Sequence, residues 1–172
     1  MHNLLIIFTV LLSSITISQE KNIETILKGH FNQLSIIECQ YFQEKELSMI
    51  TRPLISSGIF KYEKDGDIIW SQKEPFDEEY LISEKSNNKI DKYINRFIIS
   101  IITGDILSDQ TLATNYSESN KEYTISLIPK KGSMREKIKE IILIFNKEKI
   151  SLNKLEVHSQ NGDLTKINFY EN

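Results

Sequence analysis

The chain has 172 residues, of which 40% are hydrophobic and 26% charged, the balance of one globular domain with a sizeable core. A formal net charge of −3 excludes the strongly basic surface that nucleic acids and anionic membranes attract. We therefore expect a single domain and no nucleic-acid partner.

The first eighteen residues form an apolar run that ends in small and β-branched residues. The run is too short to cross a bilayer comfortably, and Thr16 and Ser18 place small residues at the −3 and −1 positions of a cleavage site. We predict a signal peptide over residues 1–18, cut after Ser18, and one mature domain over residues 19–172 in the periplasm. The alternative is an uncleaved anchor, because the segment contains no Lys or Arg.

Apolar residues recur at helical spacing between Asn22 and Leu34, with Asn22 as a plausible N-cap. This pattern predicts an amphipathic helix that packs on the concave side of a sheet. His30 lies near the end of the helix without the neighbours of a metal set, which favours a partly exposed helix histidine.

A long strand is predicted over residues 36–50, and it contains Cys39, the single cysteine of the chain. One thiol cannot form an internal disulfide, so stability must come from the core. Because Cys39 lies at an apolar position of the strand, a small buried hydrophobic residue is favoured over a reactive thiol.

The stretch from Leu54 to Leu81 has the pattern of two consecutive β-hairpins, with a type I′ turn signal at Asp65-Gly66 in the first. Even-numbered positions carry bulky apolar side chains that share one face of this pair of strands: Phe60, Tyr62, Ile68 and Trp70. Such a face must either be buried or bind a ligand.

Gly58, Trp70 and Pro75 stand in the spacing G-x11-W-x4-P, and this frame resembles the corresponding stretch of the LolA-type periplasmic outer-membrane lipoprotein carriers. Residues 155–172 resemble, more weakly, the last hairpin of that family. The resemblance implies an α+β fold: a strongly curved, unclosed antiparallel β-barrel (a half-barrel) with helices covering its concave apolar face. It also implies a cavity for lipid acyl chains, with an inner-membrane donor and an outer-membrane acceptor as partners.

The family carriers have an Arg-Pro pair at the turn six residues before the tryptophan, where this chain has Lys64 and Asp65. In the family, that arginine is thought to hydrogen-bond the helical lid. Lysine keeps the charge but lacks the planar donor fork, so it cannot reproduce the arginine's network. We expect Lys64 to be a lid contact whose loss changes ligand binding only modestly. With lysine in place of the arginine, the resemblance still implies a generic lipid cavity.

Residues 93–102 form an almost wholly apolar helical stripe. On the residues alone, a helix packed into the core as a plug is favoured, whereas the resemblance favours a lid over an apolar cavity. Under the lid hypothesis, the helix and the hairpin face together supply the candidate lipid-binding residues Phe60, Tyr62, Ile68, Trp70, Ile94, Phe97 and Ile101. A second short helix is predicted over residues 105–113, with Ile106 and Leu107 facing inward.

The last third of the chain has the pattern of a sheet. Clean alternation over residues 121–129 predicts a half-buried strand, and the capping-box spacing of Ser133 and Glu136 predicts a helical turn before Ile138. A three-stranded meander should follow over residues 138–145, 150–158 and 164–170, with a turn at Asn161-Gly162.

The mature chain offers few groups for catalysis: two histidines, His30 and His158, no nucleophile motif, and acidic pairs only at adjacent strand or turn positions. We predict no enzymatic activity, no catalytic residue, no metal site and no cofactor. Two hypotheses remain. One is a monomeric periplasmic carrier that shields the acyl chains of a lipoprotein or another lipid, and the other is a periplasmic protein-interaction module with the same fold and no lipid cargo.

Overall fold

The computed structural model describes residues 23–31, 33, 35–64, 68–82, 99–101 and 103–171. Several sequence-based predictions lie outside the described residues: the signal peptide, the Asn22 cap, the Asp65-Gly66 turn, and the candidate residues Ile94 and Phe97.

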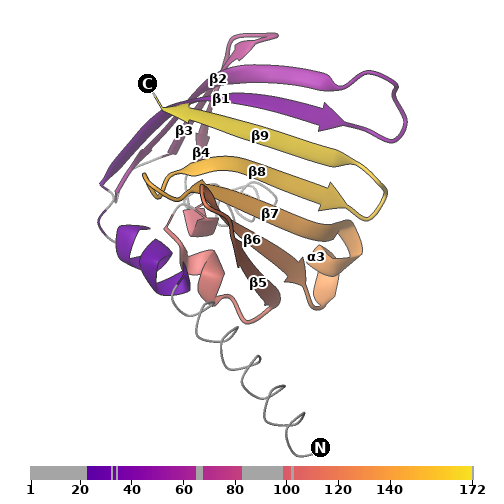
Figure 1. The fold of residues 1–172 in the computed structure, drawn as a ribbon. Coiled ribbons are helices and arrows are strands. Elements are labelled where there is room, and N and C mark those ends of the chain that lie inside the picture. The colour runs from indigo at the N-terminus through magenta and orange to yellow at the C-terminus, as the bar shows by residue number, and fades with distance from the viewer. Residues whose placement is uncertain are drawn as a thin grey trace, which may run out of the picture.

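In the described part of the chain, nine strands form one antiparallel sheet in the order β4-β3-β2-β1-β9-β8-β7-β6-β5 (Figure 1). The last strand of the chain therefore pairs with the first, and the edge strands β4 and β5 leave the sheet open. This curved, unclosed antiparallel sheet with helices confirms the predicted α+β half-barrel class. The strands are β1 (Ile36–Glu46), β2 (Leu54–Glu63), β3 (Ile68–Glu74), β4 (Glu78–Ile82), β5 (Leu112–Glu118), β6 (Glu122–Pro129), β7 (Ile138–Asn146), β8 (Leu152–Ser159) and β9 (Leu164–Glu171).

The helices gather against the half of the sheet formed by β5 to β8. They are the helix of residues 23–31, a helical segment at residues 99–101 and the 3-10 helix η1 (Asp105–Ser108), whereas α3 (Gly132–Lys137) connects β6 to β7 (Figure 1). Within the described residues, no helix is long and apolar enough to span a membrane.

The period-two alternation of β6 and β7 explains the first hydrophobic cluster. Every second side chain of these strands is buried, and the inward-facing set packs against the helices. Phe31 of the first helix meets Phe145 of β7 edge to face, with ring centroids 5.7 Å apart. We call this the helix-side cluster; its buried members are Ile23, Leu27, Phe31, Ile101, Ile106, Leu107, Leu112, Tyr123, Ile125, Leu127, Ile141, Leu143 and Phe145.

A second cluster, here the hairpin-side cluster, lies on β1, β2, β3 and β9. Its buried members are Cys39, Tyr41, Phe60, Tyr62, Ile68 and Ile167. Trp70 packs against it, with its ring 4.6 Å from that of Tyr41 and 5.5 Å from that of Phe60. Leu155 of β8 packs against both clusters and so marks the line where they meet.

Gly58 has a steric explanation. The pairing of β2 with β3 shifts register between Ser57 and Gly58, and a Cβ atom at Gly58 would lie only 1.9 Å from the carbonyl oxygen of Ser71. No side chain fits there unless the backbone moves. The glycine of the G-x11-W-x4-P frame is therefore required by the close approach of β2 and β3.

The first hairpin has the predicted shared face. Tyr62 pairs with Ile68 and Phe60 with Trp70, so these four candidate side chains lie on one face of the sheet, as predicted. The predicted turn at Asp65-Gly66 lies outside the described residues.

The ends of two elements differ from the predictions. The strand predicted to reach residue 50 ends at Glu46 and is followed by a turn in which the Ile50 N–H donates to the Leu47 carbonyl. The helix predicted over residues 105–113 ends at Ser108, and Leu112 begins β5, a strand that the sequence patterns did not indicate.

The helical turn predicted before Ile138 is confirmed as α3, but Ser133 does not cap it. The N-cap position of α3 is occupied by Lys131, which makes no side-chain capping hydrogen bond. Near the end of the chain, β8 begins at Leu152 rather than at residue 150, because Ile150 has a φ of 57° and cannot belong to a strand.

Candidate functional site

A cavity of about 1030 Å³ lies where the two clusters meet. Trp70, Phe60 and Cys39 line it from the hairpin side, and Phe31 and Ile101 line it from the helices. The remaining apolar lining comes mainly from β8, β9 and the start of β1: Leu152, Leu155, Ile167, Phe169, Ile36 and Ile37. This volume is at the upper end of the range of about 300–1,000 Å³ that is typical of ligand sites.

The structure brings three of the predicted candidate residues together. Phe60, Trp70 and Ile101 line the cavity, although they come from β2, β3 and the helical segment at residues 99–101. Tyr62 and Ile68 share the face of Phe60 but are buried in the hairpin-side cluster and do not line the cavity.

Lys64 was the candidate lid contact. It is exposed at the end of β2, and its backbone N–H donates to the carbonyl of Ser35, 2.7 Å away. Among the described residues, Lys64 does not line the cavity. The hydrogen bond joins the end of β2 to the start of β1, so the backbone of this residue has a structural role.

Sequence reasoning missed the contribution of β8 and β9. Leu155, Ile167 and Phe169 were placed on predicted strands, but they were not recognised as lining residues. The strand order explains the omission. Because β9 inserts between β1 and β8, residues that are distant in the chain from the first hairpin come to lie beside it. Alternation alone does not reveal which strands become neighbours.

The cavity is apolar within and polar at one end. The polar lining consists of side chains from the β7–β8 turn, the ends of the adjacent strands and the first helix: Asn146, Lys149, Ser151, Asn153, Lys154, Asn168, Glu171, Glu38, Glu122 and His30. An apolar space bordered by polar groups suits an amphiphile, because a chain can be buried while its headgroup remains hydrated.

Cys39 lines this cavity but is poorly suited to nucleophilic chemistry. Burial raises the pKa of its thiol to about 11, and the nearby carboxylates of Glu171 and Glu38 add to the effect. The thiolate is the reactive form, so a raised pKa makes the residue inert at neutral pH. Within the described part of the chain, no group of His, Cys, Asp and Glu side chains could hold a metal ion.

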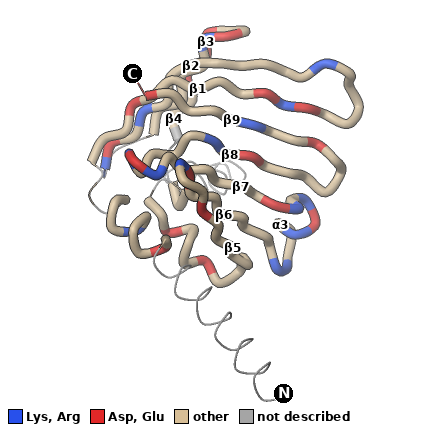
Figure 2. Tube along the Cα trace, in the orientation of Figure 1, with Lys and Arg blue, Asp and Glu red and all other residues tan. Residues whose placement is uncertain are grey.

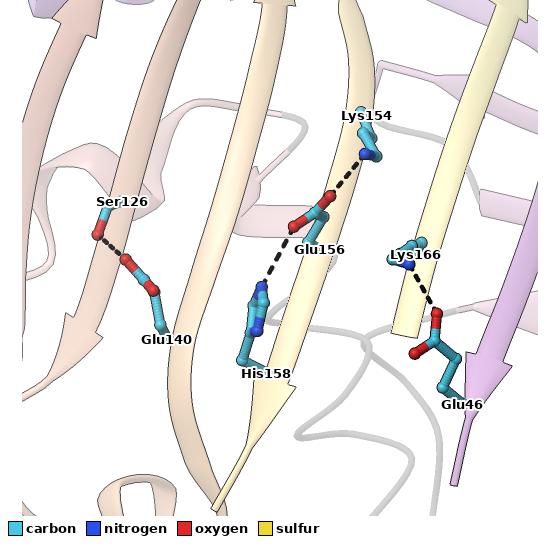
Figure 3. A network of polar contacts seen from close by, with 7 residues as sticks. All are labelled: Glu46, Ser126, Glu140, Lys154, Glu156, His158 and Lys166. Carbon is cyan, nitrogen blue, oxygen red and sulfur yellow. Dashed lines mark hydrogen bonds and ion pairs between the residues drawn. The ribbon is translucent and has the colours of Figure 1, made fainter. Parts of the chain in front are cut away.

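The opposite face of the sheet, which we call the outer face, carries a polar network (Figure 3). Glu156 accepts hydrogen bonds from Lys154 at 2.6 Å and His158 at 3.2 Å. Burial acts to raise the pKa of Glu156, but these two partners outweigh it, so the pKa is lowered overall. Two further pairs lie nearby, Ser126 with Glu140 and Lys166 with Glu46. The outer face is therefore the hydrated one, which leaves the inner face for an apolar ligand.

Fold and cavity together define a class of protein: an open, curved antiparallel sheet that holds helices against one face, with an apolar space between them. No family model matches the chain, and no curated protein matches it.

Solved structures with a similar fold exist. A DUF1329 family protein from Desulfovibrio piger has 10% identity and a TM-score of 0.39, over 91% of this chain and 92% of that one. A putative outer membrane lipoprotein-sorting protein domain from Vibrio parahaemolyticus has 10% identity and a TM-score of 0.32, over 86% and 89%. The LolA superfamily protein NE2245 from Nitrosomonas europaea has 7% identity and a TM-score of 0.24, over 81% and 86%. These likenesses assign the chain neither a family nor a ligand.

Proposed function

We propose that this protein is a carrier that shields the acyl chains of a lipoprotein or another lipid during transport towards the outer membrane. The cavity of about 1030 Å³, with Trp70, Phe60 and Phe169 in its wall, is the observation that carries the proposal. Each CH₂ group removed from water contributes about 0.8 kcal/mol. Ten buried methylenes would supply about 8 kcal/mol, and the costs of association reduce the net free energy of binding below this value.

The proposed setting is the periplasm. The apolar run at residues 1–18 supports export with cleavage of a signal peptide, and the frame of Gly58, Trp70 and Pro75 supports a carrier of the LolA type. The carrier would act as a monomer that receives its cargo from an inner-membrane donor and gives it to an outer-membrane acceptor. In this proposal the site binds and does not catalyse.

One observation favours the alternative, a protein-interaction module without lipid cargo. β4 is an edge strand of the sheet, and Tyr80 and Leu81 on it are exposed, as is Phe76 in the turn before it. An apolar edge strand can pair with an extended segment of another protein. Under this alternative the cavity would take no lipid, and the edge would bind the partner.

Lipid binding separates the two functions. Protein purified from a periplasmic fraction without detergent is extracted with organic solvent, and the extract is analysed by mass spectrometry. The stripped protein is then titrated with 1-monopalmitoylglycerol while the fluorescence of Trp70, the only tryptophan, is recorded. The carrier predicts co-extracted acyl lipid and a saturable change in fluorescence. Absence of both would contradict the carrier and favour the interaction module.

A further inference from the structure

The sheet splits between β8 and β9 at the polar end of the cavity. The pairing of these two strands stops at Lys154 and Asn168. Beyond that point β9 continues to pair with β1 as far as Glu171, while β8 continues to pair with β7 as far as Leu152 (Figure 1). We call this split, between residues 151–153 and residues 169–171, the seam.

All six residues of the seam line the cavity. Residues of both faces of the sheet therefore contribute to the same space, since Cys39 and Phe169 point to the inner face whereas Glu38 and Tyr170 are on the outer face. A continuous sheet would separate these side chains. The seam is consequently an opening from the apolar interior to the outside.

The β7–β8 turn holds one side of the seam in a fixed shape. The side-chain oxygen of Asn146 accepts hydrogen bonds from the backbone N–H groups of Glu148 and Lys149, each at 2.9 Å. Ile150 follows with a φ of 57°, a conformation that β-branched residues rarely adopt. This turn places the Lys149 ammonium against the carboxylate of Glu171, so an ion pair joins the two sides of the seam.

Charge at the seam determines which headgroup it accepts. Among the described residues, two lysines line the cavity, and each already has a carboxylate partner: Lys149 has Glu171, and Lys154 has Glu156 at 2.6 Å. Two further carboxylates line the same cavity, those of Glu38 and Glu122. Acidic and basic residues alternate along the strands of the sheet (Figure 2). An anionic headgroup would have to displace a carboxylate from its lysine and would then lie beside it.

We propose that the seam is the mouth of the cavity, and that it accepts acyl lipids with an uncharged headgroup, such as a glycerol ester or an amide, in preference to anionic ones. The hydroxyl and amide groups of Ser151, Asn153 and Asn168 supply donors and acceptors for such a headgroup. This inference rests on the proposed carrier function and deepens it, because it defines the class of cargo and the place where its headgroup lies.

The test compares two ligands with the same acyl chain, 1-monopalmitoylglycerol and palmitate, by Trp70 fluorescence at pH 8. Wild type should bind the glycerol ester about tenfold more tightly than palmitate. Glu171→Gln removes the carboxylate that pairs with Lys149, and it should raise the affinity for palmitate about tenfold, so that the preference for the ester disappears. The matched control is Glu46→Gln, which changes the net charge equally but removes the partner of Lys166 on the outer face, away from the cavity.

Glu46→Gln should leave both affinities as in wild type, and circular dichroism should show all three proteins folded. A gain of affinity for palmitate cannot result from misfolding, so the measurement on Glu171→Gln is the decisive one. Equal affinities of wild type for the two ligands, or no gain for palmitate in Glu171→Gln, would overturn the headgroup inference and leave the carrier intact. If neither ligand binds to wild type, the carrier function fails, and the inference fails with it.

Discussion

Phe169 and Phe145 are the same residue type in two different environments, and replacing each with Asp separates a cavity wall from a packed core. Phe169 of β9 is half-buried, lines the cavity and lies 6.2 Å from the ring of Phe60. Phe145 of β7 is only 1% exposed, packs edge to face on Phe31 and is not among the lining residues. We expect Phe169→Asp to fold and to lose acyl-chain binding, and Phe145→Asp to unfold.

The magnitudes follow from burial. Truncating a buried Phe costs about 3–5 kcal/mol, and an unpaired buried carboxylate adds several kcal/mol. For Phe145 the sum is comparable to the whole stability of a domain, about 5–15 kcal/mol. Because Phe169 is only half-buried, truncating it should cost roughly half as much, about 2 kcal/mol. The carboxylate of the new aspartate can reach water through the cavity. A charge in the wall should weaken binding of an acyl chain at least about a hundredfold, because the chain would desolvate it.

Two measurements are needed for each variant: the free energy of unfolding in urea and the Trp70 fluorescence response to 1-monopalmitoylglycerol. Phe169→Leu is the conservative control and should bind nearly as wild type does. Equal destabilisation by Phe169→Asp and Phe145→Asp would show that no cavity exists at Phe169. A folded Phe169→Asp protein with wild-type affinity would refute the assignment of this cavity to the acyl chain.

Three further predictions concern the scaffold. Gly58→Ala should destabilise the protein by about 3 kcal/mol in urea, because the new Cβ would meet the carbonyl oxygen of Ser71, and a change below about 0.5 kcal/mol would contradict this. The pKa of Glu156 is lowered, so its charged form stabilises the protein at pH values above the ordinary glutamate value of 4.5. The difference in unfolding free energy between wild type and Glu156→Gln should therefore disappear as the pH falls below this value. A difference that does not change with pH would contradict this prediction. Cys39, with its pKa near 11, should resist an aromatic disulfide reagent at pH 8 in the native protein and react fully in urea.

The sequence was sufficient to predict the elements with regular alternation. The alternation of Tyr123, Ile125 and Leu127 predicted β6. The strands of the last meander were predicted with nearly the observed bounds, because their apolar residues also recur at every second position. β5 was missed because Leu112 is its only buried position, and the helical appearance of the preceding residues, which include Ile106 and Leu107, was extended into it. The end of β1 was misplaced because its polar outer part has no periodic signal.

Only a small part of the cavity wall could be predicted, for a physical reason. Phe60 and Trp70 lie on one hairpin, so their shared face follows from parity and register alone. Leu155 and Phe169 depend on β9 pairing with β1, a contact between the two ends of the chain that no local pattern encodes. The seam was equally invisible, because it results from the point at which two strands stop pairing.

The most direct test of the carrier is a crystal structure of the protein with 1-monopalmitoylglycerol bound. The account predicts electron density for the acyl chain between Trp70 and Phe31, with the glycerol group at the seam beside Lys149. An empty cavity in a crystal that contains the ligand elsewhere, or a cavity filled by the protein's own side chains, would contradict the central claim that this space binds lipid.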